Sequence, residues 1–521
     1  MMRLLPTNVY SRQVLFLTVL LAVLIISFGS AHGTDPRSER ELERVVAAWD
    51  LIRSSPFAAP GEGADLVEDA INGMLGTLDP HTHFLDEDTF RYMRQEQQGE
   101  FYGIGISFDI RDGTLTVISP IEGTPAWDAG IRAGDRIVRI EGESTQGITT
   151  TEVINTLRGK RGSRVTIAIQ RHGEEEIREV TLVRGKIPLK SVRTPQMIDG
   201  ETGYVRIDTF AQSTEVELKE ALAVLRELGA KRLILDLRFN SGGLLTAAQE
   251  VAQRFLVKGT PIVLTRGRLN TSKMDIEAEA ADGDTRTPLI VLVNEYSASA
   301  SEIVAGAIQD HDRGLIVGET TFGKGLVGSL LPLSGDTALQ ITTAQYYTAS
   351  GRFIQKPYDI EHRRRLGEDG KPLFKGWQKE GEKLTYHTDN GREVQGGGGI
   401  APDVEVKEPL LTDVLALIDS HAFDFAVEYI GGGAMVSEDM VIDDGMVDRF
   451  LAFLDDKSVK YDGELLRKDI AEVKRELKHQ LIAVALGADA GYLYSIRQHP
   501  MVEKALELFP ELPRLIAPVN A

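Results

Sequence analysis

Three serines could supply a nucleophile. Ser297, Ser299 and Ser301 alternate with alanines directly after the apolar run PLIVLV, which ends at Val293. A serine hydroxyl attacks a carbonyl carbon when a general base accepts its proton and N–H groups stabilise the resulting oxyanion. The first N–H groups of a helix, together with the helix dipole, favour negative charge at that place. A serine between a buried strand and a helix is therefore well placed for nucleophilic chemistry.

The same serines also have a structural interpretation. The sequence SASE at 299–302 fits the capping box, in which serine and glutamate side chains bond N–H groups of the first helical turn. Ser299 is then the N-cap of a helix whose apolar face begins with Ile303 and Val304. The local sequence leaves both the nucleophile and the cap open.

Lys324 is the candidate base for such a serine. It stands between Gly323 and Gly325 in GETTFGKGLVGS. A surface lysine needs no flanking glycines, whereas a lysine in a closely packed backbone does. Burial lowers the pKa of a lysine towards neutrality, so that its amine can act as a general base. The alternative is a flexible Gly-Lys-Gly loop in solvent.

Histidines are weaker candidates. His311, in QDHDRG, has no obvious acidic residue to orient it. His81 and His83 could be metal ligands, but two histidines in a turn after Asp-Pro are more typical of a solvated turn. There is no HExxH or GxSxG motif and no cysteine. We expect neither a metal site nor a cofactor.

Length and charge bound the class of protein. The chain has 521 residues, of which 42% are hydrophobic and 26% charged, and a formal net charge of −20. This length corresponds to about three domains. The acidic balance argues against a general nucleic-acid-binding protein, which needs a basic face.

The N-terminal segment predicts export. Arg3 and Arg12 precede the apolar stretch 14–28, and small residues follow at 29–31. This pattern is typical of a signal peptide, although an uncleaved membrane anchor would look almost the same. Residues 1–31 are therefore a signal peptide or membrane anchor, and we expect the rest of the chain in the periplasm or cell envelope.

The remaining sequence predicts a multidomain α/β protein. Residues 36–98 have the spacing of two or three short helices. Residues 101–186 read as an α+β module of five short strands and one helix. In residues 190–407, Val/Ile/Leu-rich strands alternate with amphipathic helices, which predicts a largely parallel sheet covered on both faces. Residues 408–521 read as mostly helical, with a break at the glycines 431–433.

An ordered series of motifs from Asp79 to Val406 resembles the carboxyl-terminal processing proteases, also called tail-specific proteases. The series reads DPHTHFLDEDTF, GEFYGIGISF, GTPAWDAGIRAGDRIVRIEG, LRGKRG, LILDLRFNSGGLL, NEYSASASEIVAGAIQD, GETTFGKGLV, TTAQYYTASGRFIQ and GGGGIAPDVEV. The resemblance implies a Ser/Lys serine endopeptidase. It also implies that 101–186 is a PDZ domain, inserted ahead of a ClpP/crotonase-like protease core.

The resemblance implies specific roles for residues of this chain. The middle serine of SASAS, Ser299, would be the nucleophile, and Lys324 would be the base. The oxyanion hole would use the N–H of Ala300 and one N–H from the turn at Gly242 and Gly243. The serines on either side of the nucleophile would keep its surroundings small and polar.

The resemblance further implies how substrates are chosen. The stretch Gly103-Ile104-Gly105-Ile106 resembles the loop with which PDZ domains bind a free C-terminal carboxylate while the bound tail adds a strand. We therefore expect protein substrates with apolar C-terminal tails. Arg158, in LRGKRG, is a candidate for coupling the PDZ domain to the protease core; its alternative role is a solvated loop charge.

Further partners follow from the same resemblance. The helical C-terminal region leads us to expect a homo-oligomer, as terminal helices dimerise some relatives. An adaptor protein is a candidate partner, and the N-terminus is a candidate membrane tether. No nucleic-acid partner is expected.

One residue departs from the family pattern. The family usually has glutamine four residues after the lysine, where it helps to orient the amine, and this chain has Gly328. Gln340 on the following predicted strand, a water or backbone packing would then have to orient Lys324. The alternative function is a catalytically weak PDZ-containing scaffold or binding protein.

Overall fold

The computed structural model describes residues 36–54, 66–76, 78–79, 81–111, 113–171, 174, 176–333, 336–356, 384–409 and 413–518. The predicted export segment at 1–31 lies outside these residues. Within the described ranges, no helix is both long enough and apolar enough to cross a membrane.

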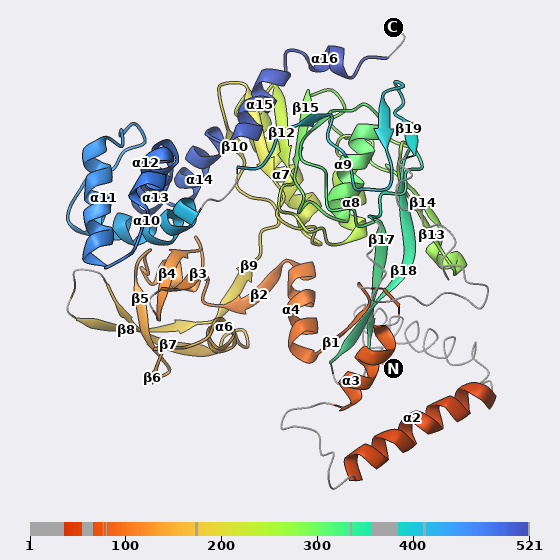
Figure 1. Cartoon of the computed structure of the whole chain (residues 1–521), viewed down its shortest axis with the longest axis horizontal. Coiled ribbons are helices and arrows are strands. Elements are labelled where there is room, and N and C mark those ends of the chain that lie inside the picture. Colours follow the sequence, from red (N-terminus) through yellow and green to blue (C-terminus); the bar gives the residue numbers. More distant parts are fainter. Residues whose placement is uncertain are drawn as a thin grey trace, which may run out of the picture. The chain divides into compact units, whose positions relative to one another are not determined.

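The chain divides into two compact units, residues 1–84 and 85–521. The first unit contains α2 (Pro36–Ser54) and α3 (Leu66–Leu75), and β1 (His83–Leu85) begins at its end. The elements that carry the candidate site all belong to the second unit (Figure 1).

An α+β part follows α4 (Glu87–Gln98). Its main sheet has the order β3-β4-β5-β7-β8, with β6 paired to β5, and a separate ladder joins β2 to β9. The elements are β2 (Glu100–Gly103), β3 (Ile106–Arg111), β4 (Thr114–Pro120), α5 (Pro125–Asp128), β5 (Arg136–Ile140), β6 (Glu143–Ser144), α6 (Thr150–Leu157), β7 (Arg164–Gln170), β8 (Ile177–Val183) and β9 (Gly185–Pro188). Because β3 is an edge strand, one side of its backbone can accept a further strand.

The prediction of five strands and one helix for this part was wrong in number. The stretch FYGIGISFDI, expected as one strand, is split into β2 and β3. The split lies at Gly105, whose carbonyl accepts hydrogen bonds from Ile121 N (2.9 Å) and Thr124 Oγ1 (3.1 Å). The missed elements α5, β6 and β9 have four residues or fewer, which is too short to show a periodic pattern.

The core contains a six-stranded sheet with the order β10-β11-β12-β15-β16-β21, parallel except for β10. Its strands and helices are β10 (Gln196–Met197), β11 (Thr202–Arg206), α7 (Thr214–Glu227), β12 (Arg232–Asp236), α8 (Leu245–Ala252), β15 (Leu289–Val293), α9 (Ala300–Asp310), β16 (Leu315–Gly318) and β21 (Val404–Glu405). Every residue of β15 is buried, as expected for a strand covered on both faces.

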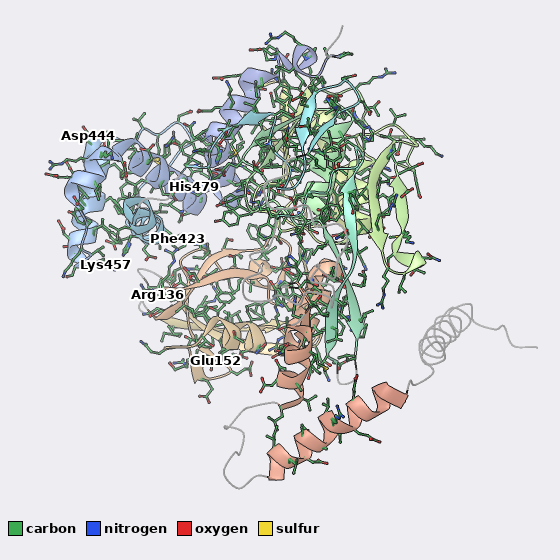
Figure 2. All side chains as sticks on the ribbon, turned by 45° about the vertical axis from the view of Figure 1, so that its right-hand side comes forward. Arg136, Glu152, Phe423, Asp444, Lys457 and His479 are labelled. Carbon is green, nitrogen blue, oxygen red and sulfur yellow. The ribbon has the colours of Figure 1, made fainter. Side chains whose placement is uncertain are left out.

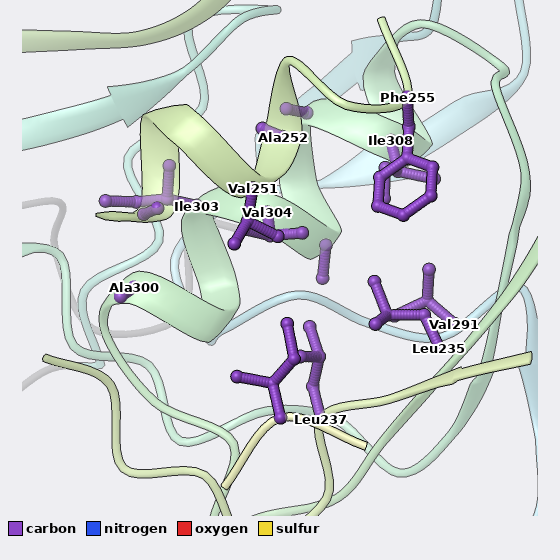
Figure 3. Packing of buried hydrophobic residues seen from close by; sticks show 14 of the residues in the cluster. Leu235, Leu237, Val251, Ala252, Phe255, Val291, Ala300, Ile303, Val304 and Ile308 are labelled. Carbon is purple, nitrogen blue, oxygen red and sulfur yellow. The ribbon is translucent and has the colours of Figure 1, made fainter. Parts of the chain in front are cut away.

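Different helices cover the two faces of this sheet. On one face, Leu235 and Val291 pack in a cluster with Val251 of α8 and Val304 of α9 (Figure 3). On the other face, Ile234 and Ile290 pack in a cluster with residues from the C-terminal helices. The expected two-sided sheet is therefore present, and part of the C-terminal region completes it.

One Val/Ile/Leu-rich strand of the range 190–407, for which a largely parallel sheet was predicted, does not belong to that sheet. Strand β13 (Pro261–Gly267) lies in an antiparallel sheet with β14 (Met274–Glu277) and β18 (Ala338–Thr348), and β17 (Leu326–Pro332) pairs with β18. The 3-10 helix η1 (Asn270–Ser272) precedes β14, and β19 (Thr385–His387) pairs with β20 (Glu393–Gln395). Exposed Pro261 and Arg266 fit a partly solvated strand, which antiparallel sheets tolerate.

The C-terminal region is helical, as predicted, and its first helix ends at Gly431. The helices are α10 (Asp413–Gly431), α11 (Asp444–Asp456), α12 (Gly463–Lys468), α13 (Ile470–Leu486), α14 (Ala488–Arg497), α15 (Pro500–Leu508) and α16 (Leu512–Leu515). Phe423 of α10 (Figure 2) lies under the Arg111 guanidinium of β3, with 4.7 Å between Cζ and the ring centroid. Asp424 lies 3.6 Å from the same guanidinium, so α10 contacts the α+β part directly.

Candidate active site

Ser299 is the N-cap of α9, as the capping pattern predicted. Its backbone conformation, however, differs from that of an ordinary N-cap. Its φ is 54° and its ψ is −110°, whereas most N-caps have extended backbone. Such a conformation is strained for any residue other than glycine, and strain of this kind gathers at functional sites. Ser299 is half-buried, while Ala300 behind it is fully buried. Ser299 is therefore the only partly exposed residue in the stretch 297–301.

The serines on either side are buried and have structural roles. Ser297 Oγ donates to Leu237 O (2.8 Å) and accepts from Asn294 N (2.9 Å). Ser301 Oγ donates to Asn240 O (2.9 Å). Both hydroxyls bind the segment that follows β12, so they fix the loop of Ser299 against its neighbour.

Gly242 and Gly243 lie at the end of that neighbouring segment. A Cβ at Gly242 would come within 2.8 Å of Ser299 Cβ and 3.0 Å of Ala300 N, so only glycine allows this approach. The N–H of Gly242 donates to Asn240 Oδ1 (2.8 Å). Within the described part of the chain, the N–H groups of Gly243 and Ala300 have no hydrogen-bond partner. Of the two glycines, Gly243 therefore fits an oxyanion donor better.

Lys324 lies in a loop that follows β16 and is tightly packed on both sides. A Cβ at Gly323 would lie 2.6 Å from Lys356 Cγ, and one at Gly325 would lie 3.0 Å from Gln355 N. Lys324 itself is half-buried. The close backbone approach expected from the two glycines is present, and the alternative of a free solvent loop does not hold.

Glu302 joins the serine loop to the lysine loop. Its Oε2 accepts from Ser299 N (2.8 Å) and from Lys324 N (2.9 Å). Its Oε1 accepts from Thr321 Oγ1 (2.6 Å) and from Gly323 N (2.7 Å). The sequence pattern identified Glu302 only as half of a capping box; its bonds to residues about 20 positions away left no local signal.

The environment of Glu302 opposes its charge. The side chain is completely buried, and burial raises its pKa to about 7, although the hydrogen bonds from Thr321, Lys324, Gly323 and Ser299 oppose the rise. The four donors stabilise the ionised carboxylate, but they offset only part of the cost of burying its charge. Glu302 thus bonds both loops while burial still favours its neutral form.

Tyr346 of β18 forms a second link between the two loops. Its hydroxyl lies 2.6 Å from Lys324 O and 3.1 Å from Ser299 O. Burial and the neighbouring Glu302 charge raise the pKa of Tyr346 well above its usual value, so it remains a donor at neutral pH. This residue was not identified from the sequence.

His311 has an acidic partner, contrary to the sequence-based expectation. Its Nδ1 lies 2.7 Å from Asp389 Oδ2, and Asp389 comes from the turn between β19 and β20. His311 is the C-cap of α9, however, and Ser299 is the N-cap of the same helix. A helix of this length separates its ends by about 16 Å, so His311 is not a base for Ser299.

The side-chain amide of Gln340 fills the space beside Gly328. A Cβ on Gly328 would lie 3.2 Å from Gln340 Nε2, and Gln340 lies on the partner strand β18. Within the described residues, the buried Gln340 Oε1 has no hydrogen-bond partner. The side chain missing at position 328 is therefore replaced in space by a glutamine from the neighbouring strand.

The α+β part has open amides where a carboxylate loop was expected. Between β2 and β3, the N–H groups of Ile104 and Gly105 have no partner among the described residues, and they adjoin the edge strand β3. Gly103 and Ile106 belong to the flanking strands. The stretch is thus open to an anion next to an edge that can accept a strand.

Arg158 is half-buried against α4 and is not a solvated loop charge. Its Nη1 donates to Gln95 Oε1 (2.9 Å), and its Cζ lies 4.1 Å from the ring centroid of Phe101. The same helix is joined to the core, because Gln97 O accepts from Gln212 N (2.9 Å). Arg158 therefore contacts the helix that leads from the α+β part to the core.

His81 and His83 belong to no cluster that could hold a metal ion, as far as the described residues extend.

Comparison with known proteins gives a consistent result. The profile of Peptidase family S41 matches residues 201–362, and that of the PDZ domain matches residues 116–171. A carboxy-terminal-processing protease of Bartonella bacilliformis is 39% identical over 338 residues, which are 64% of this chain and 77% of that protein. The carboxy-terminal processing protease CtpA of Bacillus subtilis is 34% identical over 319 residues, 61% of this chain and 67% of that protein. The solved photosystem II D1 C-terminal processing protease is 32% identical, with a TM-score of 0.34 over 59% of this chain and 83% of that one.

The raised pKa of Glu302 predicts that the difference in stability between the native chain and Glu302→Gln depends on pH. The folded chain holds the Glu302 proton up to about pH 7, whereas a free glutamate loses it near 4.5. The stability contributed by the neutral form is complete below pH 4.5 and is lost as the pH rises to about 7. We expect the Tm of Glu302→Gln, relative to the native chain, to increase through this window and to be constant outside it. Thermal unfolding of both proteins from pH 4 to 9 measures this; a difference independent of pH would contradict it.

Proposed function

Because the chain belongs to peptidase family S41, as a serine-type C-terminal processing peptidase with a PDZ domain, we propose that Ser299 and Lys324 form its catalytic dyad. The observation that carries this proposal is the single oxygen of Glu302 shared by Ser299 N and Lys324 N. It draws together two loops that are separate in the sequence. The strain at Ser299 and the packed glycines around Lys324 support the same pair.

The proposed reaction has two steps through an acyl-enzyme. Neutral Lys324 accepts the proton of Ser299 Oγ as this oxygen attacks the substrate carbonyl carbon. The N–H groups of Gly243 and Ala300 stabilise the oxyanion, and the lysine proton passes to the leaving amine. A water then attacks the ester carbonyl carbon while Lys324 accepts its proton. The bond between this carbon and Ser299 Oγ breaks, the Lys324 proton passes back to Ser299 Oγ, and the product leaves with its new carboxyl group.

The finer fold assignment belongs to the same proposal. We take residues 190–407 to be a ClpP/crotonase-like core, supported by the parallel sheet and its cover of α8 and α9. The catalytic residues would lie in the loops after β12, β15 and β16, where parallel sheets commonly place their sites.

The proposed substrates are exported proteins with apolar C-terminal tails. The export signal predicted at residues 1–31 supports a location in the periplasm or cell envelope. The open amides of Ile104 and Gly105 would bind the terminal carboxylate, and the tail would pair with the edge strand β3. Arg158 would communicate occupancy to the core through Gln95 on α4. A homo-oligomer and an adaptor protein remain part of the proposal.

Gln340 is proposed to orient Lys324 in place of a glutamine at position 328. Its amide occupies the space beside Gly328, and its buried carbonyl oxygen can accept a hydrogen bond from an amine. Since the dyad then keeps an orienting amide, the glycine at position 328 does not require a scaffold function.

The first test separates the three serines. Ser299→Ala should lower cleavage at least about a thousandfold with an unchanged fold, because it removes the nucleophile. The free energy of unfolding of Ser297→Ala should be about 1–3 kcal/mol lower than that of the native chain, because the substitution leaves buried hydrogen-bond partners unsatisfied. Ser301→Ala should show a similar loss. Digestion of an unstructured protein with an apolar C-terminus, beside thermal unfolding, measures both effects. Near-normal cleavage by Ser299→Ala would overturn the dyad.

The second test concerns the tail. Amidation of the substrate C-terminus removes the charge that the open amides bind, so kcat/KM should fall by about tenfold, mainly through KM. The matched comparison is one peptide with a free and an amidated C-terminus, cut by the same enzyme. Equal rates for the two peptides would remove carboxylate recognition from the proposal.

The third test concerns position 328. Gly328→Gln must push the Gln340 amide aside, but that amide is the flexible end of a side chain and can move at low cost. We expect Gly328→Gln to cleave the tail-bearing substrate as fast as the native chain or faster. Turnover across pH for both proteins measures this. A clearly slower Gly328→Gln would show that the glycine makes necessary room.

A further inference from the structure

Three large aromatic side chains are exposed on the three loops that carry the proposed catalytic groups. Phe239 precedes the Gly242-Gly243 turn, Tyr296 precedes Ser299, and Phe322 precedes Lys324. Their exposed fractions are 49%, 55% and 46%. Large apolar side chains exposed together on the surface of a soluble domain commonly mark a binding site.

Phe239 and Tyr296 form a built surface. Their rings stack with centroids 5.5 Å apart and an interplanar angle of 16°. Both backbones are held by one buried acceptor, because Asn294 Oδ1 accepts from Phe239 N (2.9 Å) and from Tyr296 N (3.2 Å). One buried asparagine thus fixes the two loops so that their rings meet.

The backbone of Phe239 is strained to achieve this. Its φ is 60°, a value that is rare and unfavourable for a bulky residue. An asparagine or glycine would adopt the same turn more easily. A large aromatic that is both strained and half in water adds little to the core, so the strain points to a role at the surface.

The backbone of Phe322 is bonded to the loop that carries Tyr296. Its N–H donates to Ser297 O (3.0 Å), the residue directly after Tyr296. Phe322 is also two residues from Lys324, and Tyr296 is three residues from Ser299. Tyr296 therefore stands on the loop of the proposed nucleophile, and Phe322 stands on the loop of the proposed base.

We propose that Phe239, Tyr296 and Phe322 bind apolar side chains of the extended substrate segment next to the scissile bond. This inference rests on the proposed dyad of Ser299 and Lys324. It adds a second recognition element to the enzyme: the PDZ domain selects the free tail, and the aromatic surface selects the cutting site within the unfolded segment. The occupant is the substrate chain, because the three aromatics share loops with the groups that act on it.

The test uses peptides with the same apolar tail that differ only around the cut. One series has leucine or phenylalanine within two positions of the scissile bond, and the other has serine or glutamate there. Apolar contacts of this size change kcat/KM by about tenfold or more, so the native chain should prefer the apolar series by that factor. Phe239→Asn/Tyr296→Ser should reduce the preference to less than about threefold, mainly through KM. The asparagine accommodates the positive φ of position 239.

Three controls make the outcome specific. Phe239→Tyr keeps a stacked ring and should retain the preference, and Phe322→Ser should weaken it independently. Leu228→Ser removes an apolar side chain that is 58% exposed at the end of α7 and should change nothing. A small serine-directed fluorophosphonate should label Ser299 equally in all variants, which shows that the dyad is intact.

Several results would overturn the inference. One is an undiminished preference in Phe239→Asn/Tyr296→Ser with full labelling of Ser299. Another is a change in oligomeric state of that variant in light scattering, since the surface would then bind a second copy of this chain. If the native chain neither cleaves nor is labelled at Ser299, the dyad itself fails, and this inference fails with it.

Discussion

The candidate site depends on a buried carboxylate that water does not reach. Glu302 accepts four hydrogen bonds, two on each oxygen, and the donors come from the serine loop and the lysine loop. Burial of an ionised carboxylate is unfavourable unless its oxygens are fully hydrogen-bonded. The loops must therefore meet at Glu302, because their donors offset part of the cost of burying its charge, although burial still raises its pKa to about 7. This requirement turns two separate segments into one site.

Further polar bonds extend this arrangement to the segment after β12. Asn240 O accepts from Ala298 N and Ser301 Oγ, and Asn294 Oδ1 accepts from Phe239 N. The segment after β12 is thus bonded to the serine loop through buried acceptors of Asn240 and Asn294, which have few other donors within reach. Such networks are rigid when they are satisfied. Rigidity is what allows the strained backbone at Ser299 to persist, because the surrounding bonds leave it no relaxed alternative.

The sequence could predict the parts of this site that have local signals. The capping pattern located Ser299 at a helix start, and the flanking glycines indicated a packed Lys324. Local patterns could not show that Glu302 and Tyr346 bind both loops, because those bonds depend on how distant segments fold together. The same limit explains why the pairing of β13 was not predicted. Its Val/Ile/Leu content is typical of a strand in a parallel sheet, but its pairing is antiparallel. The choice between Gly242 and Gly243 likewise depends on Asn240 Oδ1, a contact made within the folded turn.

The C-terminal helices belong to the structure that positions the site. Burial alone would raise the pKa of Asp236 at the end of β12, but Arg238 and Arg206 lower it to about 2, so it is a fixed charge. Arg238 also lies 2.8 Å from Nδ1 of His499, the N-cap of α15, and Tyr204 and Tyr492 of α14 share a hydrogen bond. Arg238 directly precedes Phe239 and the segment that binds Ser301. The helices that cover the second face of the sheet therefore also anchor the strand end from which the proposed oxyanion turn begins.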